Sequence, residues 1–223
     1  MQVTDTRRPV PIHRATDLRA PWWVVCAAAL APILLIGGWT IAATFQPPTY
    51  LWTRDTISAL ARIGAPERWF MTTAFAGLGV CYLLIAFGLR AAAPLGRMVL
   101  FIGGGTTILV SALPLPATGT SQAHGLVALV GFLAMALWPL AAARWSGVTE
   151  TTPWAFRLPI AIAATVALLV INGWFGLSLL PHEMVGVSER ASAAAEALWP
   201  LAVVLSTRVS GLRLTAAERA PTG

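Results

Sequence analysis

The chain carries too little charge for a water-soluble domain. Asp, Glu, Lys and Arg make up 11% of its 223 residues, whereas soluble domains carry about 25%. Lysine is absent, and all 15 basic residues are arginines. The shortfall is concentrated in long stretches that contain no formal charge, and 57% of the residues are hydrophobic. We therefore expect lipid, not water, to be the main solvent of this chain.

Other absences exclude several kinds of site. The two cysteines, Cys26 and Cys81, lie inside apolar stretches, so they indicate neither a disulfide framework nor a metal-ligand spacing. With three histidines in the whole sequence, a His-rich catalytic zinc site is not expected, and no cofactor is predicted. The net charge of +6 is scattered over the ends of apolar segments, which argues against nucleic acid as a partner.

Six apolar segments are present, and only the last contains a formal charge, at Glu196. Inside hydrocarbon each backbone N–H and C=O must find a partner within its own segment, and the alternating polarity of a barrel strand is missing, so the segments are predicted to be helices. They cover residues 22–45, 69–89, 98–113, 125–143, 158–180 and 191–206. Gly103, Gly104 and Gly105 indicate either close helix contact or a break that lines a cavity. The predicted fold class is an all-α integral membrane bundle of six transmembrane helices.

The arginines predict the orientation of this bundle. If the N-terminus is cytoplasmic, the cytoplasmic segments hold 11 of the 15 arginines, which the positive-inside rule favours. These are Arg7, Arg8, Arg14, Arg19, Arg90, Arg97, Arg144, Arg157, Arg208, Arg213 and Arg219. We expect a multi-pass protein of the cell membrane with both termini in the cytoplasm. Its parts are a cytoplasmic segment 1–20, a transmembrane domain 21–208 and a cytoplasmic tail 209–223.

Polar residues gather in the three loops on the predicted outer side. In the first loop, Asp55 is placed to cap a short amphipathic helix over residues 55–64, which is expected to lie in the membrane interface. The second loop delivers His124 to the fourth helix, where it either bonds a neighbouring carbonyl or water or takes part in function. The third places Glu189 and Arg190 at the entry of the last helix, where part of the cluster is ordinary capping chemistry.

Glu196 is the most informative residue, because a carboxyl group inside a membrane helix is costly unless it is protonated, paired or facing a wet cavity. Helical spacing places Glu189, Ser192, Glu196 and Trp199 on one stripe of the last helix. Asn172 lies at a similar depth in the fifth helix, at ~1.5 Å per residue. The loop between these helices is short enough to make them neighbours, so the sequence predicts a hydrogen bond between Asn172 and Glu196.

Four tryptophans fall inside the predicted helices instead of at the membrane interfaces. Packing alone explains them, since aromatic rings contribute a large apolar area wherever they lie. The alternative is an aromatic-lined cavity beside the buried acid, which would suit a hydrophobic substrate or a cationic intermediate. The four are Trp39, Trp138, Trp174 and Trp199.

Three short motifs lie on the predicted outer side. They are Asp55-Thr56-Ile57-Ser58, Pro114 to Pro116 followed by His124, and Glu189-Arg190. With them, most of the chain resembles a prokaryotic family of six-helix membrane proteins, the domain of unknown function 998. The resemblance implies that Asp55, Ser58, His124 and Arg190 form one extracytoplasmic cluster. The chain departs from the family pattern at Ala61, where members tend to have glycine, and in stretch 114–121, which has no Asp.

Two hypotheses of different classes follow for the function. The first is an intramembrane enzyme that acts on a lipid-soluble substrate by isoprenoid cyclisation or lipid hydrolysis, with Glu196, Glu189 or Asp55 as acid and His124 as base. The expected substrate-binding residues are Ser58, Asn172, Arg190, Trp174 and Trp199. The second is a non-enzymatic protein that binds membrane lipid or stabilises a partner, in which the polar cluster only ties loops together. A transporter is disfavoured, because no inverted repeat is visible, although Asn172 and Glu196 keep that alternative open.

Overall fold

The computed structural model describes residues 19–149, 152–180 and 183–219. Over these residues the secondary-structure elements are α-helices and one short 3-10 helix. The helices are α2 (Trp22–Thr44), α3 (Ile57–Leu60), α4 (Trp69–Gly88), α5 (Pro94–Ala112), α6 (Gln122–Ala142), η1 (Trp154–Phe156), α7 (Leu158–Ser178) and α8 (Val185–Arg219). The predicted cytoplasmic segment 1–20 lies outside the described residues except for its last two positions. The chain is therefore an all-α protein over its described parts.

Five helices, α2, α4, α5, α6 and α7, are long and apolar enough to cross a membrane. The fold is thus that of a multi-pass helical membrane protein. α8 is not among the five, because Glu189, Arg190, Glu196 and Arg208 make it less apolar. Its role as a sixth span stays a prediction. The helix also extends well beyond the predicted segment 191–206, since the polar residues that flank this segment on both sides are helical too.

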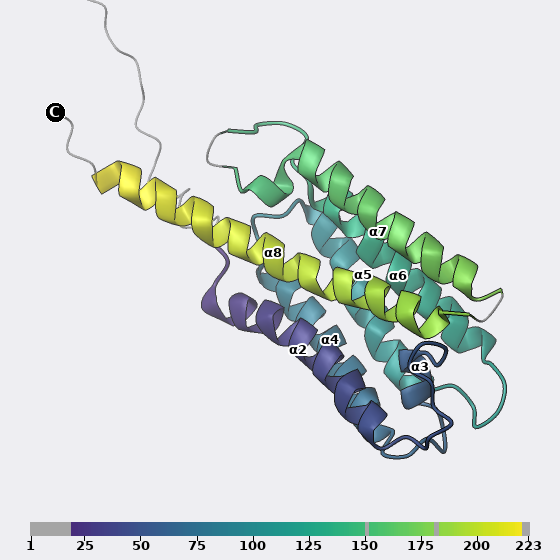
Figure 1. Ribbon diagram of the computed structural model, residues 1–223. Helices are drawn as coiled ribbons and strands as arrows, with labels where there is room; N and C mark the ends of the chain where they lie inside the picture. The colour runs from purple at the N-terminus through teal and green to yellow at the C-terminus, as the bar shows by residue number, and fades with distance from the viewer. Residues whose placement is uncertain (1–18, 150–151, 181–182, 220–223) are drawn as a thin grey trace, which may run out of the picture.

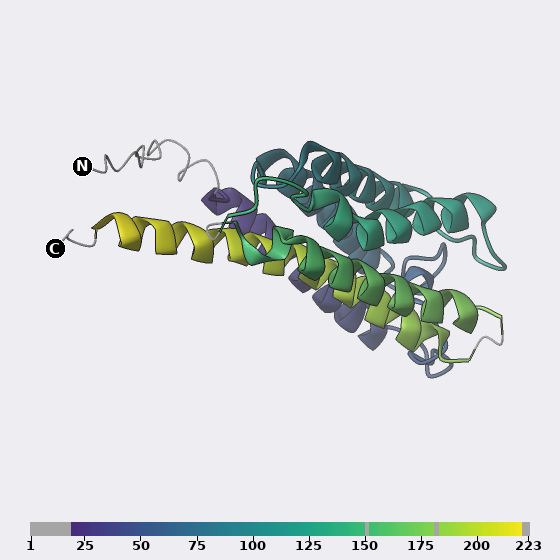
Figure 2. The same cartoon turned by 90° about the horizontal axis from the view of Figure 1, so that it is seen from above.

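The long helices form a closed ring. In order, α2 packs on α4, α4 on α5, α5 on α6, α6 on α7, α7 on α8, and α8 returns to α2. Figure 1 shows α8 lying between α2 and α7, and its C-terminal part extends beyond the other helices. In the second view the helices again run along one common direction (Figure 2). A ring of this kind encloses side chains from several helices in its interior.

Glycines permit a close contact in the ring between α4 and α5. A Cβ atom added at Gly79 would lie 2.6 Å from the carbonyl oxygen of Gly104, and one added at Gly104 would lie 2.8 Å from that of Gly79. The backbones therefore approach each other more closely than side chains would permit. α5 runs unbroken through all three of its central glycines, so close packing, and not a break, is the alternative that is observed.

The short helix α3 closes one end of the ring, where it contacts α2, α4 and α8. It is shorter than the predicted helix over residues 55–64, and its apolar side chains Ile57 and Leu60 are buried. Thr56 caps it by accepting a hydrogen bond from the Ala59 N–H at 3.1 Å. The predicted capping by Asp55 is wrong, because that carboxylate reaches backwards and accepts the Leu51 N–H at 2.7 Å. The location of α3 in a membrane interface stays a prediction.

Candidate functional site

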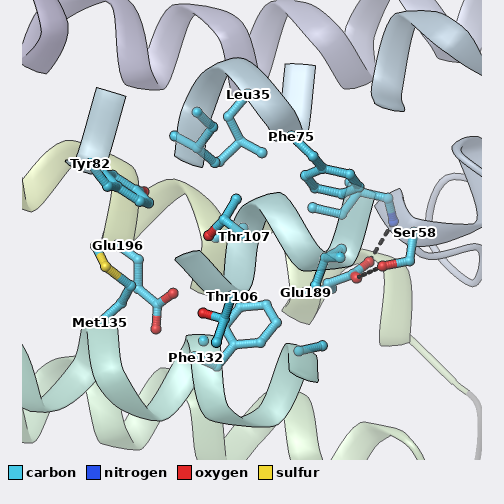
Figure 3. Close-up of a pocket in the computed structure, with 16 residues that line it drawn as sticks. Leu35, Ser58, Phe75, Tyr82, Thr106, Thr107, Phe132, Met135, Glu189 and Glu196 are labelled. Atoms are coloured by element: carbon cyan, nitrogen blue, oxygen red, sulfur yellow. Dashed lines mark hydrogen bonds between the residues drawn. The ribbon is translucent and has the colours of Figure 1, made fainter. Parts of the chain in front are cut away.

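A cavity lies inside the ring, directly beneath α3. Its volume is about 70 Å³, enough for several water molecules. Side chains from α2, α3, α4, α5, α6 and α8 line it, and two of them carry carboxyl groups. Figure 3 shows the lining, in which the polar members are Ser58, Tyr82, Thr106, Thr107, Glu189 and Glu196 and the largest apolar ones are Phe75 and Phe132. This cavity is the candidate site.

Glu196 borders the deeper part of the cavity and is 5% exposed. Its Oε1 atom accepts a hydrogen bond from Nδ2 of Asn172 at 2.9 Å, which confirms the predicted pair. The same Nδ2 atom donates to the carbonyl oxygen of Phe132 at 3.2 Å. Asn172 therefore joins the carboxyl group on α8 to α7 and α6.

Glu189 lies two turns earlier on α8, at the α3 end of the cavity, and precedes the predicted membrane segment 191–206. Its carboxylate accepts hydrogen bonds from the backbone N–H of Ile57 and, at 3.2 Å, from Oγ of Ser58. Burial raises the pKa of this carboxyl group to about 7, although the Ile57 N–H, the Arg190 guanidinium and Ser58 act to lower it. The carboxylate thus holds α3 against α8 and faces the cavity at the same time.

Arg190, the next residue, turns away from the cavity and holds the loop before α3. Its Nη1 atom donates to the carbonyl oxygens of Trp52 and Asp55, both at 2.9 Å. Its Nη2 atom donates to the Tyr50 hydroxyl. The guanidinium therefore fixes the course of this loop, and the contact with the Asp55 backbone brings two of the four residues implied by the family resemblance together.

His124 takes no part in these contacts. It is buried, its Nδ1 lies 2.7 Å from the carbonyl oxygen of Leu113, and it is not among the residues that line the cavity. Of the two alternatives for this histidine, bonding to a neighbouring carbonyl is the one observed. The hydroxyl of Ser58, which the family resemblance implies lies in one cluster with His124, is bonded to Glu189 instead.

The stripe predicted on α8 divides between two faces. Glu189 and Glu196 line the cavity together with Ala193. Ser192 instead donates to the carbonyl oxygen of Ile171 on α7 at 3.2 Å, and Trp199 lies edge-on to the Trp154 ring, with ring centroids 6.2 Å apart. A stripe with steps of three and four residues is wide enough to serve two neighbours.

None of the four interior tryptophans lines the cavity. Trp138 is fully buried in the packing core, and Trp174 is 42% exposed. The aromatic walls are supplied by Phe75, Tyr82 and Phe132, which sequence reasoning missed because nothing marks the inward face of a helix that is apolar all round. Thr106 and Thr107 also line the cavity and were not predicted as site residues. Their position in an apolar helix was the available signal.

The described residues contain no group of three or more His, Cys, Asp or Glu side chains arranged to hold a metal ion. The site consists of carboxyl, hydroxyl and aromatic groups. Such groups can transfer protons, accept and donate hydrogen bonds, and face a cation through aromatic rings. The candidate chemistry is therefore that of acids and bases.

The fold and the cavity define a class of protein, the polytopic helical membrane proteins with a cavity inside the helix ring that two carboxyl groups line. A family model described as "Protein of unknown function (DUF998)" matches residues 28–206, and the chain belongs to that family. The match includes every residue that lines the cavity. No curated protein and no solved structure matches the chain.

Proposed function

We propose that the protein is an intramembrane acid–base enzyme that acts on a lipid-soluble substrate in the cavity beneath α3. The observation that carries the proposal is the placement of two buried carboxyl groups, Glu189 and Glu196, on the wall of one cavity. Placing a charged side chain at the centre of a membrane helix costs roughly 2.5–3.5 kcal/mol, and such residues usually mark functional sites.

The spacing of the two acids favours one of the two reactions considered. They are seven residues apart on α8, which corresponds to about 10 Å along the helix axis. Hydrolysis of a lipid requires the acid and the base at the same bond. Cyclisation of an isoprenoid instead takes up a proton at one double bond and releases one from a distant carbon. Two acids at opposite ends of an aromatic cavity suit the second reaction.

In this scheme Glu196 donates its proton to a carbon–carbon double bond, and a carbocation forms. A second double bond of the chain attacks the cation and closes a ring, and a proton then leaves a neighbouring carbon for the Glu189 carboxylate. The product is an isomer of the substrate, and one proton has been taken up and one released. The rings of Phe75, Tyr82 and Phe132 lie where they can stabilise the cation.

The surroundings of Glu189 suit its task as the proton acceptor. A pKa of about 7 allows Glu189 to accept a proton at neutral pH, while Ser58 and Ile57 hold its carboxylate in place. The cavity of about 70 Å³ is smaller than the roughly 150 Å³ that holds a benzene ring, so the substrate would have to widen it, and the rest of the chain would extend past α3. His124 and Asp55 are engaged in loop contacts and have no step in this scheme.

The arginine distribution supports an outward-facing site. With α8 as the sixth span, the α3 end would lie on the outer side of the cell membrane and both termini in the cytoplasm. At the opposite end, Arg97 donates to the carbonyl oxygens of Ala86 and Phe87 at 2.8 and 3.0 Å, and Arg144 to that of Ala91 at 3.3 Å. In the proposed topology Arg97 caps the cytoplasmic end of α4, and Arg144 holds the cytoplasmic loop between α4 and α5.

Mass spectrometry of hydrophobic molecules that co-purify with the protein tests the proposal. The set comprises the wild type, Glu196→Gln and, as a matched control at an exposed loop position, Glu183→Gln. We expect an unsaturated chain and its cyclic isomer with the wild type and the control, and only the linear form with Glu196→Gln. When membranes that already contain the linear chain are moved into heavy water, newly formed cyclic isomer should carry one deuterium from the solvent. Identical lipids in all three samples would instead favour the non-enzymatic lipid-binding alternative.

A further inference from the structure

The amide of Asn172 is oriented by two acceptors from two different helices. Its Nδ2 atom carries two hydrogens, and the two hydrogen bonds that it donates go to the Phe132 carbonyl oxygen at 3.2 Å and to Glu196 Oε1 at 2.9 Å. The Oδ1 atom of the same amide is buried and has no hydrogen-bond partner among the described residues. Reversing the amide would place Oδ1 against two oxygens, so this orientation is the one that the neighbours enforce.

The donated hydrogen bond distinguishes the two oxygens of the Glu196 carboxyl group. An oxygen that accepts from an N–H is the carbonyl oxygen of a protonated carboxyl, and the proton lies on the other oxygen. Oε1 is bound to α7, which contributes no residue to the cavity wall. Oε2 is therefore the oxygen on the cavity side, and the Glu196 carboxyl group points toward Thr106 in Figure 3.

We propose that Asn172 is a positioning residue that keeps the proton of Glu196 on Oε2, directed into the cavity. The proposal rests on the proposed function in naming Glu196 as the proton donor. It adds that the direction of the donor depends on a residue outside the cavity. A carboxyl group free to rotate would present its proton to the cavity and to the helix interface in turn, and only one of these directions is productive.

The surroundings of Asn172 make this role separable from helix packing. One residue earlier, the Ile171 carbonyl oxygen accepts a hydrogen bond from Ser192 on α8 at 3.2 Å. Two turns earlier on α7, Thr165 Oγ1 accepts the Leu140 N–H of α6 at 3.1 Å. Contacts between α7 and its two neighbours therefore remain when the Asn172 amide is removed. Thr165→Val removes a hydrogen bond between α6 and α7 without touching Glu196 and provides the matched control.

Infrared difference spectroscopy of the full-length protein in lipid bilayers tests this assignment. The spectrum of the wild type minus that of Glu196→Gln isolates the C=O stretch of Glu196, which a protonated carboxyl shows and an ionised carboxylate lacks. At neutral pH we expect this band at the lowered frequency of a carbonyl that accepts a hydrogen bond. In Asn172→Leu it should shift to the higher frequency of a free carbonyl, and in Thr165→Val it should stay in place.

Several outcomes would overturn the assignment. They are a wild-type spectrum without the Glu196 band, a wild-type band already at the free-carbonyl frequency, and the same band in the wild type and Asn172→Leu. The first two need no α7 variant and do not depend on how Asn172→Leu folds. If the cyclic isomer is found, its fraction should drop at least tenfold in Asn172→Leu and not in Thr165→Val. A shifted band without any co-purifying isomer would retain the role of Asn172 and reject the proposed reaction.

Discussion

At the scale of single residues, Glu189 combines two roles. Its carboxylate faces the cavity, and it also accepts the hydrogen bonds that hold α3. Burial opposes its ionisation, while the Ile57 N–H, Arg190 and Ser58 favour it. The balance leaves its pKa at about 7, above the ordinary value of 4.5. The contact between α3 and α8 is therefore linked to proton binding in the neutral range.

This linkage predicts a pH dependence of stability. Between pH 4.5 and about 7 the folded protein keeps a proton on Glu189 that the unfolded chain has released. The contribution of this group is therefore complete below pH 4.5 and is lost as the pH rises through 7. We expect the difference in Tm between the wild type and Glu189→Gln to fall across this window and to level off above it.

Thermal unfolding in detergent, recorded at intervals from pH 4 to 8.5, measures the difference. Glu183→Gln, which changes an exposed acid in the loop before α8, should keep the wild-type profile. A difference between wild type and Glu189→Gln that grows as the pH rises from 4.5 to 7 would show that the folded state favours the ionised form and would contradict the assignment.

Arg190 predicts a second single-residue effect, on the loop that precedes α3. Removing the guanidinium in Arg190→Ala deletes hydrogen bonds to the Trp52 and Asp55 carbonyls and to Tyr50, each worth about 1 kcal/mol. Local opening should then become at least tenfold more frequent. We expect trypsin to cleave after the exposed Arg54 at least tenfold faster than in the wild type.

The fragment masses identify the cleavage at Arg54. Arg68→Ala is the matched control, because that guanidinium lies over the Trp69 ring, 4.6 Å from its centroid, at the same end of the ring. Equal cleavage rates in Arg190→Ala and the wild type would mean that the loop is held by other contacts.

At the scale of helices, packing between α4 and α5 depends on two glycines that face each other. A methyl group in Gly79→Ala would meet both the Gly104 carbonyl oxygen and a side-chain carbon of Ile108 at 2.6 Å. Overpacking of this kind costs typically about 1–3 kcal/mol. Since α5 carries the cavity residues Thr106 and Thr107, we also expect the shape of the cavity to change.

The measurement is unfolding in mixed micelles with increasing denaturing detergent. Gly105→Ala provides the control, because a Cβ atom at that position meets nothing within 4 Å. We expect a lower midpoint for Gly79→Ala and none of this loss for Gly105→Ala. Equal midpoints for Gly79→Ala and the wild type would show that the two helices can separate without cost.

Helix ends were predicted less accurately than helix existence. α5 begins at Pro94, four residues before the predicted segment 98–113, and α8 covers Val185–Arg219 where 191–206 was predicted. Apolar composition marks the part of a helix that lies in hydrocarbon. The helix itself continues as long as its backbone hydrogen bonds do, and polar residues such as Arg97 and Glu189 lie in these extensions.

At the scale of the whole molecule, the ring arrangement predicts how the chain crosses the membrane. With α8 as the sixth span, the loop that contains Ala117 would lie outside and the loop that contains Ser146 inside. Both positions are exposed. In a Cys26→Ala background, Ala117→Cys should react with a membrane-impermeant maleimide in intact cells, and Ser146→Cys only after permeabilisation.

A tag fused after Gly223 should become accessible together with Ser146→Cys, because six spans return the chain to its starting side. Reaction of Ser146→Cys in intact cells would reverse the orientation. A tag accessible from outside while Ser146→Cys is protected would remove α8 from the set of spans.

The sequence by itself determined the class of the protein, a multi-pass helical membrane protein, and one specific contact within it. Both rest on properties that can be counted along the chain. Apolar length and the absence of charge identify the helices, and equal depth on two helices joined by a short loop predicts the bond between Asn172 and Glu196. The same counting along α8 brought out Glu189 as part of the site.

The tertiary structure decided which side chains share the cavity. It paired Ser58 with Glu189 and left His124 with the Leu113 carbonyl. It also made Tyr82 and Phe132 the aromatic walls in place of the tryptophans. The physical reason is that lipid and protein interior are equally apolar, so a helix that is apolar on every side does not show which face it turns inward. That rotation is set by contacts between helices, such as the approach of Gly79 to Gly104.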